Sequence, residues 1–276
     1  MLCAHFGVAA MQQKAKLLLL SASLSLLAAC STSSQDISLI PTQTDAITQK
    51  KGAFTQPLKW SGHRPDCQGT CPYVEIDSLI FPGKKPLTEL VDQSLAALIS
   101  SLDSDRIQPD VESFIEYFWQ TAAPADEAYL AAKTIYRNPD LTTIELGAWH
   151  YHTGAAHGMS TTRFINWSHK DQKALVLDDL LQPGKREQFF AVQKQAHQKW
   201  LAKLDFAQDD PEQYLRLWPF QPTDNVAITD AGLLIKYEPY AIAPYAAGMP
   251  QILLPYSELQ DVLRPQYMPD RSGKKL

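Results

Sequence analysis

Three histidines lie close together in the sequence, and their spacing is the first feature that suggests chemistry. They are His150, His152 and His157, in the segment HYHTGAAHG. Residues two apart on a β-strand share a face, so His150 and His152 would point the same way, and His157 follows after a short turn. Imidazole nitrogens are common ligands of Zn²⁺. The sequence therefore raises the possibility of a zinc site.

The same segment also fits a tight corner between two strands. The loop itself contains no Asp or Glu that would orient the imidazoles, although metal-bound histidines usually have such a partner. Gly154 and Gly158 would supply backbone conformations with positive φ, and the imidazole of His157 would bond to backbone groups. We favour the corner and keep the metal set of His150, His152 and His157 as a minor alternative, so no metal or other cofactor is expected.

The sequence gives less support for other arrangements that are typical of enzyme active sites. Ser160 follows His157 by three residues, but no G-x-S-x-G turn surrounds it. The carboxylates that a glycosidase would need are present as Asp178, Asp179, Glu238 and Glu258. Their spacing does not place any pair at the required separation, and LDDLL is more typical of a cap for the helix that follows. We expect a protein without catalytic activity.

The N-terminal segment is typical of a bacterial export signal. From Met11 the chain runs MQQKAKLLLLSASLSLLAAC, with two lysines ahead of an apolar run that is short for a bilayer of about 30 Å. Its end resembles the lipobox, in which the cysteine, here Cys30, is acylated. We expect translation to start at Met11 and residues 1–29 to be a lipoprotein signal peptide. Ser31 suggests outer-membrane sorting, and a plain secretory signal is the alternative.

Cys67 and Cys71 form the spacing C-x3-C in DCQGTCPY. Outside the cytoplasm such a pair closes a small ring, so a local disulfide is expected. A redox pair usually has C-x2-C at the start of a helix, whereas Pro72 and a strand-like run follow here.

The mature chain contains helical and strand-like segments without strict alternation. Residues 30–57 are polar and are expected to be a flexible tether. Helical spacing of apolar residues predicts helices over 87–102, from Pro109 to before Pro124, and over 185–204. Strands are predicted at YVEIDSLIF, YLAAKTIYRN, TTIELGAWHYH, TTRFINWSH, VAITDAGLLIKYEPY and MPQILLPYSEL, with a short helix near 257–263.

This order predicts an α+β fold, in which helices pack on an antiparallel sheet. The three middle strands have short connections and are expected to form a meander. We expect two subdomains, an N-terminal portion at 58–140 and a C-terminal portion at 141–265, followed by a tail at 266–276.

Two segments resemble a known family. HTGAAHGMSTTRFINWSHKDQKALVLDDLL and YEPYAIAPYAAGMPQILLPYSEL are similar to the RsiV-like extracytoplasmic domain, which occurs in the anti-sigma factor RsiV and beside the catalytic domain of some peptidoglycan deacetylases. The resemblance extends over about Trp60 to Leu263 and implies a two-part α+β module. RsiV senses lysozyme by binding it, so the resemblance implies a protein partner. Ala241 departs from the family, because relatives often carry an acidic residue there.

The second segment offers a candidate partner-binding surface. Its tyrosines alternate with prolines and a glycine that would stiffen a loop, and aromatic rings on a stiff loop bind partners at low entropic cost. The candidate residues are Tyr237, Glu238, Tyr240, Tyr245 and Tyr256. Alternatively, individual tyrosines pack under the loop and hold the fold together.

The net charge of the chain argues against nucleic acid as a partner. The formal net charge is −5, with no block of Lys or Arg that would bind nucleic acid. We expect a non-enzymatic, lipid-anchored protein of the outer membrane that binds a cationic peptidoglycan-degrading enzyme such as lysozyme, as sensor, inhibitor or immunity factor. The alternatives are a glycan-binding module, a structural lipoprotein, or a cell-wall hydrolase or deacetylase.

Overall fold

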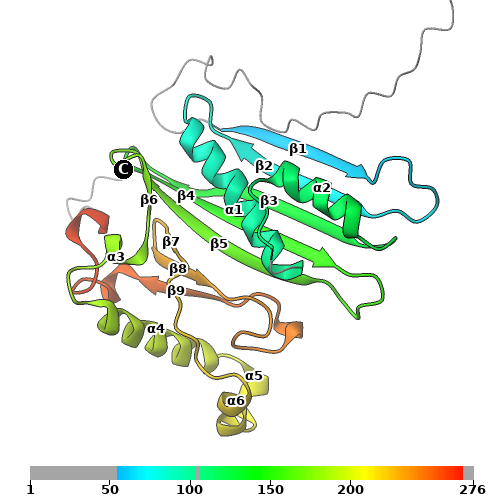
Figure 1. Ribbon diagram of the computed structural model, residues 1–276. Helices are drawn as coiled ribbons and strands as arrows, with labels where there is room; N and C mark the ends of the chain where they lie inside the picture. Colours follow the sequence, from blue (N-terminus) through cyan, green and yellow to red (C-terminus); the bar gives the residue numbers. More distant parts are fainter. Residues whose placement is uncertain (1–54, 104–105, 270–276) are drawn as a thin grey trace, which may run out of the picture. The chain divides into compact units, whose positions relative to one another are not determined.

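The larger of two sheets has six strands in the order β1-β2-β3-β4-β5-β6 (Figure 1). The computed structural model describes residues 55–103 and 106–269. The strands are β1 (Gln56–His63), β2 (Tyr73–Ile80), β3 (Glu127–Arg137), β4 (Leu141–Tyr151), β5 (Met159–Ser168) and β6 (Lys173–Leu175). All neighbours are antiparallel except β2 and β3, which run parallel because a helical connection returns the chain to the same end.

That connection consists of helices α1 (Lys85–Asp103) and α2 (Val111–Thr121), which cover one face of the sheet (Figure 1). The Asp110 side chain caps α2 by accepting the Ser113 N–H at 2.7 Å. Alternate strand residues point towards the helices, so this covered face is apolar; they include Val74, Ile76, Leu130, Ile144, Leu146 and Ala148.

The smaller sheet has three antiparallel strands, β7 (Val226–Ile228), β8 (Gly232–Lys236) and β9 (Gln251–Pro255). Its core is shared with α3 (Leu177–Leu180) and α4 (Arg186–Leu201), and the short helices α5 (Asp205–Gln208) and α6 (Pro211–Leu217) follow α4. The Asn166 side chain on β5 joins the two sheets, because it donates to Val226 O at 2.7 Å and accepts the Ile228 N–H at 2.9 Å. The three-stranded unit therefore packs at the β5 side of the large sheet.

Most of the expected elements are confirmed, and the class is mixed α+β. The meander of β3, β4 and β5 is present as expected. The sequence missed β1, whose first residues, Gln56 and Pro57, were assigned to the tether. The division expected at residue 140 falls in the turn between β3 and β4, inside one sheet. The short helix near 257–263 is a single 3-10 turn, η3 (Tyr256–Glu258).

The disulfide is confirmed, since Cys67 and Cys71 are bonded in the loop between β1 and β2. The signal peptide, Cys30, the tether up to residue 54 and the tail from residue 270 lie outside the described residues. Within residues 55–103 and 106–269, no helix combines the length and the apolar character needed to cross a membrane.

Candidate functional site

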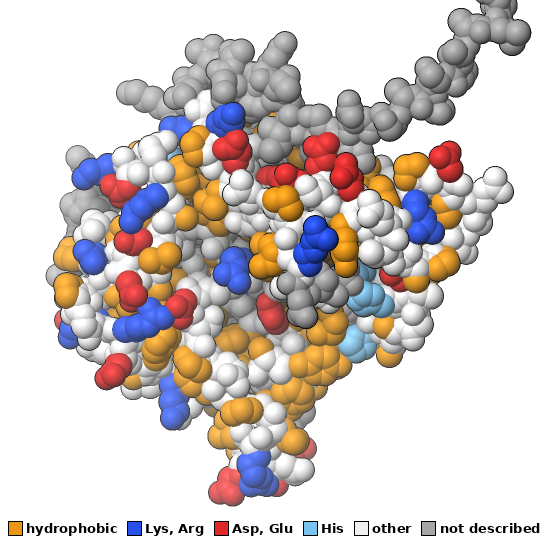
Figure 2. All heavy atoms as spheres, in the orientation of Figure 1, with side chains coloured by type: hydrophobic (Ala, Val, Ile, Leu, Met, Phe, Trp, Pro, Cys, Tyr) orange, Lys and Arg blue, Asp and Glu red, His pale blue; other side chains and the backbone are white. Residues whose placement is uncertain are grey.

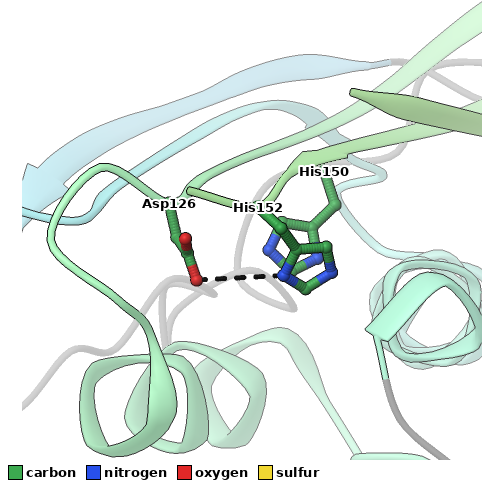
Figure 3. A group of neighbouring side chains, drawn as sticks. All are labelled: Asp126, His150 and His152. Carbon is green, nitrogen blue, oxygen red and sulfur yellow. Dashed lines mark ion pairs between the residues drawn. The ribbon is translucent and has the colours of Figure 1, made fainter. Parts of the chain in front are cut away.

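The three histidines of the opening segment lie in two different places. His150 and His152 point to the covered face, with ring centroids 3.9 Å apart, beside Asp126 (Figure 3). His150 is 2% exposed, whereas the His152 side chain is 50% exposed. The metal set of His150, His152 and His157 is therefore wrong as a group, because the turn after β4 carries His157 to other neighbours.

Asp126 is the residue that the sequence did not reveal. It precedes β3, and the register pairs Glu127 with Tyr151, which brings residues 126 and 152 to the same end of the sheet. Its Oδ1 accepts the N–H and the hydroxyl of Thr153, both at 2.7 Å, and its Oδ2 accepts the Ala123 N–H at 3.0 Å. Burial raises the pKa of Asp126, but these hydrogen bonds outweigh it, so the pKa is lowered.

His157 forms a corner with two tyrosines. Its Nδ1 lies 3.0 Å from Gly158 O, and because a carbonyl oxygen only accepts, Nδ1 is the donor. Its Nε2 shares a hydrogen bond of 3.0 Å with the Tyr240 hydroxyl. The imidazole stacks on Tyr245 with ring centroids 3.7 Å apart, and the Tyr245 hydroxyl also donates to Gly158 O. The expectation that His157 bonds to backbone groups is confirmed.

The two glycines of the corner have different roles. Gly154 has φ +86°, as expected. Gly158 does not have a positive φ, so that expectation is wrong. It is needed for space, because a Cβ there would lie 2.3 Å from the Trp149 ring.

The candidate tyrosines range from buried to exposed. Tyr237 is 4% exposed and donates to Gln221 O, and burial raises its pKa. Tyr256 donates to Thr229 O, and burial raises its pKa to about 12. Tyr240 is 44% exposed, and Tyr245 is half-buried. Glu238 is exposed and accepts a hydrogen bond from Thr161.

Tyr240 is held in place from both sides. It has φ +68°, an uncommon conformation for a residue with a side chain, and its ring lies between Trp218 and Tyr245 at centroid distances of 6.2 and 5.6 Å. We call His157, Glu238, Tyr240 and Tyr245 the corner surface. Figure 2 shows hydrophobic side chains gathered between the pale blue histidines and the lower end of the view, where Figure 1 draws α5 and α6.

A row of aromatic rings crosses the face of the large sheet that α1 and α2 leave open. Ring centroids lie 5.9 Å apart for Tyr73 and Tyr129, 5.1 Å for Tyr129 and Trp149, and 6.3 Å for Trp149 and Tyr151. We call these four residues the open-face row. The row reaches the corner surface at Gly158, which lies against Trp149 and accepts from Tyr245. Aromatic residues at alternate strand positions were the signal, but the sequence did not show that β2, which carries Tyr73, lies beside β3.

The carboxylates considered for hydrolysis are each engaged with another side chain, and Glu238 accepts from Thr161. Three have separate cationic partners, Asp178 with Arg186, Asp179 with Lys173, and Glu258 with Lys199. Asp179 also accepts the Val176 N–H and so caps α3, the short helix to which it belongs. The expectation that LDDLL caps the following helix is wrong, because α4 begins after Lys185 and has no side-chain cap.

Comparison with known proteins identifies the family. Residues 178–257 match the model described as protein of unknown function (DUF3298). A DUF3298 family protein from Pseudomonas aeruginosa PAO1, PA4972, is 33% identical with a TM-score of 0.72, over 79% of this chain and 98% of that chain.

A DUF3298 family member from Bacteroides fragilis, BF2082, is 16% identical with a TM-score of 0.61, over 78% of this chain and 96% of that chain, and it shares the fold. No curated protein matches the chain. The identity to PA4972 and its nearly complete coverage show that the chain belongs to the DUF3298 family.

Proposed function

We propose that this protein is a non-enzymatic, lipid-anchored protein of the cell envelope that binds a peptidoglycan-degrading enzyme such as lysozyme. The observation that supports this best is the corner surface, where Tyr240 is exposed yet fixed in position. The resemblance to RsiV-like domains, one of which binds lysozyme, supports the same class of partner. Residues 1–29 and Cys30 would supply export and the lipid anchor.

The corner surface has the physical properties of a binding site. Tyr240 and Tyr245 present amphipathic rings, and such residues often supply most of the binding energy at protein interfaces. His157 bonds to both Tyr240 and the backbone, so little side-chain freedom remains to be lost on binding. A partner would therefore meet a surface that is already ordered.

Charge favours a basic partner. The chain has a net charge of −5, and Glu238 lies in the corner surface. Long-range attraction of this kind speeds encounter more than it strengthens the final complex. The association rate is therefore expected to fall as salt is added.

A calorimetric titration of the full chain with a panel of lysozymes and bacterial muramidases tests the proposal. We expect one member to bind, and Tyr240→Ala to weaken that binding at least tenfold, as for a central aromatic residue of an interface. Leu253→Ala is the matched control, because Leu253 is also 44% exposed but lies on β9. Absence of binding across the panel, or equal binding by the Tyr240 variant, would overturn the proposal.

The open-face row supports a second candidate, a peptidoglycan-binding module. Sugar rings stack on aromatic faces, and Tyr73, Tyr129 and Trp149 present neighbouring rings from three adjacent strands. Co-sedimentation with purified sacculi tests this candidate. Loss of sedimentation in Tyr129→Ala but not in Tyr240→Ala would favour glycan binding by the open-face row. A wild-type chain that stays in the supernatant would exclude glycan binding.

A further inference from the structure

We propose that Asp126, His150 and His152 bind a divalent transition-metal ion, with Zn²⁺ as the best fit. Each residue offers one ligand atom, and these atoms lie within 4.8 Å of one another (Figure 3). Among the described residues, this is the one group of His, Cys, Asp and Glu side chains that meets this condition. The inference is independent of the proposed partner binding.

The distances suit a small ion. His152 Nδ1 lies 3.9 Å from Asp126 Oδ2, which is too long for a hydrogen bond. Two ligands at about 2.0–2.1 Å from a tetrahedral zinc ion would lie about 3.4 Å apart. For this pair, a movement of about half an ångström by the half-exposed His152 side chain closes the gap.

Asp126 is oriented as a ligand would be. Its Oδ1 is held by two hydrogen bonds from Thr153, and its Oδ2 accepts one from Ala123 and faces His152. Metal-binding carboxylates are normally fixed by such hydrogen bonds, and Oδ2 retains a lone pair for an ion. The carboxylate therefore needs no rearrangement to act as a single-oxygen ligand.

The sheet fixes His150 and places His152 beside it. His150 pairs with Ala128 across β4 and β3, and His152 follows on the same face just beyond the end of β4. Ligands on regular strands are held more precisely than ligands on loops. Of the three, His150 and Asp126 are buried and His152 faces solvent, which gives an ion a route to the site.

The ligand types indicate which ion is expected. Two imidazoles and one carboxylate suit zinc and related transition metals, whereas Ca²⁺ and Mg²⁺ prefer oxygen ligands throughout. Three protein ligands leave a fourth position for water or for a group of a bound molecule. The ion would tie the turn before β3 to the end of β4, so metal binding should raise the melting temperature.

Metal titration of the full chain, without a histidine tag, tests the site. Zn²⁺ is titrated in competition with a chromophoric chelator, and Co²⁺ is used as a spectroscopic probe of the ligands. His152→Ala should weaken binding by more than about 100-fold, because loss of a residue that only orients a metal ligand already costs about 10–100-fold. Asp126→Asn is the second variant, and His63→Ala is the control, since His63 is exposed on β1.

One ion per wild-type chain, lost in His152→Ala and Asp126→Asn but kept in His63→Ala, would support the site. Melting temperatures without metal show whether each variant is folded. Absence of saturable binding, or binding by His152→Ala equal to wild type, would overturn the proposal. A thiolate-to-cobalt charge-transfer band would also overturn it, because the proposed ligands include no cysteine.

Discussion

Neighbouring residues of one strand lie on opposite faces of the large sheet and have different surroundings there. Trp149, His150, Tyr151 and His152 follow one another at the end of β4, and strand alternation sends two of them to each face. The histidines meet Asp126 on the covered face, whereas Trp149 and Tyr151 join the open-face row. Four consecutive residues therefore belong to two different groups of side chains.

The covered and open faces place different demands on their side chains. On the covered face, buried polar groups need fixed partners, as Asp126 has in Thr153 and Ala123. On the open face, the rings of Tyr73, Tyr129 and Trp149 pack edge to face and keep part of their surface in contact with solvent. The covered face thus holds its polar side chains in fixed positions, and the open face presents partly exposed rings that could bind a partner.

Gly158→Val should have the largest effect, because Gly158 joins the open-face row to the corner surface. A Cβ there would enter the Trp149 ring, at 2.3 Å, so the strand end must shift. We expect a loss of about 3 kcal/mol in the free energy of unfolding, measured by urea denaturation. Gly154→Ala is the control and should lose about 1 kcal/mol through its φ of +86° alone. Equal losses would contradict the difference drawn between the two glycines.

Asp92, on α1 above the covered face, is partly buried, and Asp92→Asn should stabilise the folded protein in a pH-dependent way. Burial raises the pKa of Asp92 to about 6, against an ordinary 3.8, and its Oδ2 accepts a long hydrogen bond from Val111 N at 3.4 Å. The pKa of Asp92 is higher in the folded than in the unfolded protein, so the folded state favours the neutral carboxyl. Its contribution to the free energy of unfolding is fully present below pH 3.8 and is lost as the pH rises through about 6. The variant should match wild type near pH 3.8 and gain about 2–3 kcal/mol near pH 8. A gain of the same size at both values would exclude titration of Asp92 as the cause.

Asp126→Ala should destabilise the covered face without changing the open one. Removal of the carboxylate leaves the Thr153 and Ala123 donors without their acceptor, which we expect to cost about 2 kcal/mol at neutral pH. Unfolding monitored by circular dichroism measures the loss. Sedimentation with sacculi, if wild type shows it, should be unchanged, and its loss would mean that the two faces are coupled.

Tyr129→Ala should have the smallest effect on stability, below that of the other variants, because Tyr129 is only partly buried on the open face. We expect a loss of about 1 kcal/mol or less from the two edge-to-face contacts. Thermal unfolding checks this value. A loss as large as that of Gly158→Val would show that the row holds the fold together.

Much of the fold could be predicted because its signals are local. The helical spacing of Val111, Phe114, Ile115 and Phe118 predicted α2, and the alternation in YVEIDSLIF predicted β2. β1 was missed because its residues are exposed or only partly buried, so it lacks an apolar alternation. The parallel pairing of β2 and β3 depends on how two helices return the chain, which no local pattern specifies.

The candidate sites were only partly predictable, because they depend on contacts between residues that are distant in the sequence. His150 and His152 share a face through strand spacing, but Asp126 reaches them through the register between β3 and β4. The tyrosines were recognised as a set, yet Tyr237 is buried, Tyr245 and Tyr256 are partly buried, and Tyr240 is exposed. Neither register nor burial can be read from the spacing of one segment.

The most direct test of this account is a calorimetric titration of a binding muramidase or lysozyme into three proteins: wild type, Tyr240→Ala and His152→Ala. If the corner surface binds the partner and the group of Asp126, His150 and His152 is a separate site, Tyr240→Ala should lose at least tenfold in affinity and His152→Ala should bind as wild type. Equal affinities for all three proteins, or equal losses in both variants, would contradict the account.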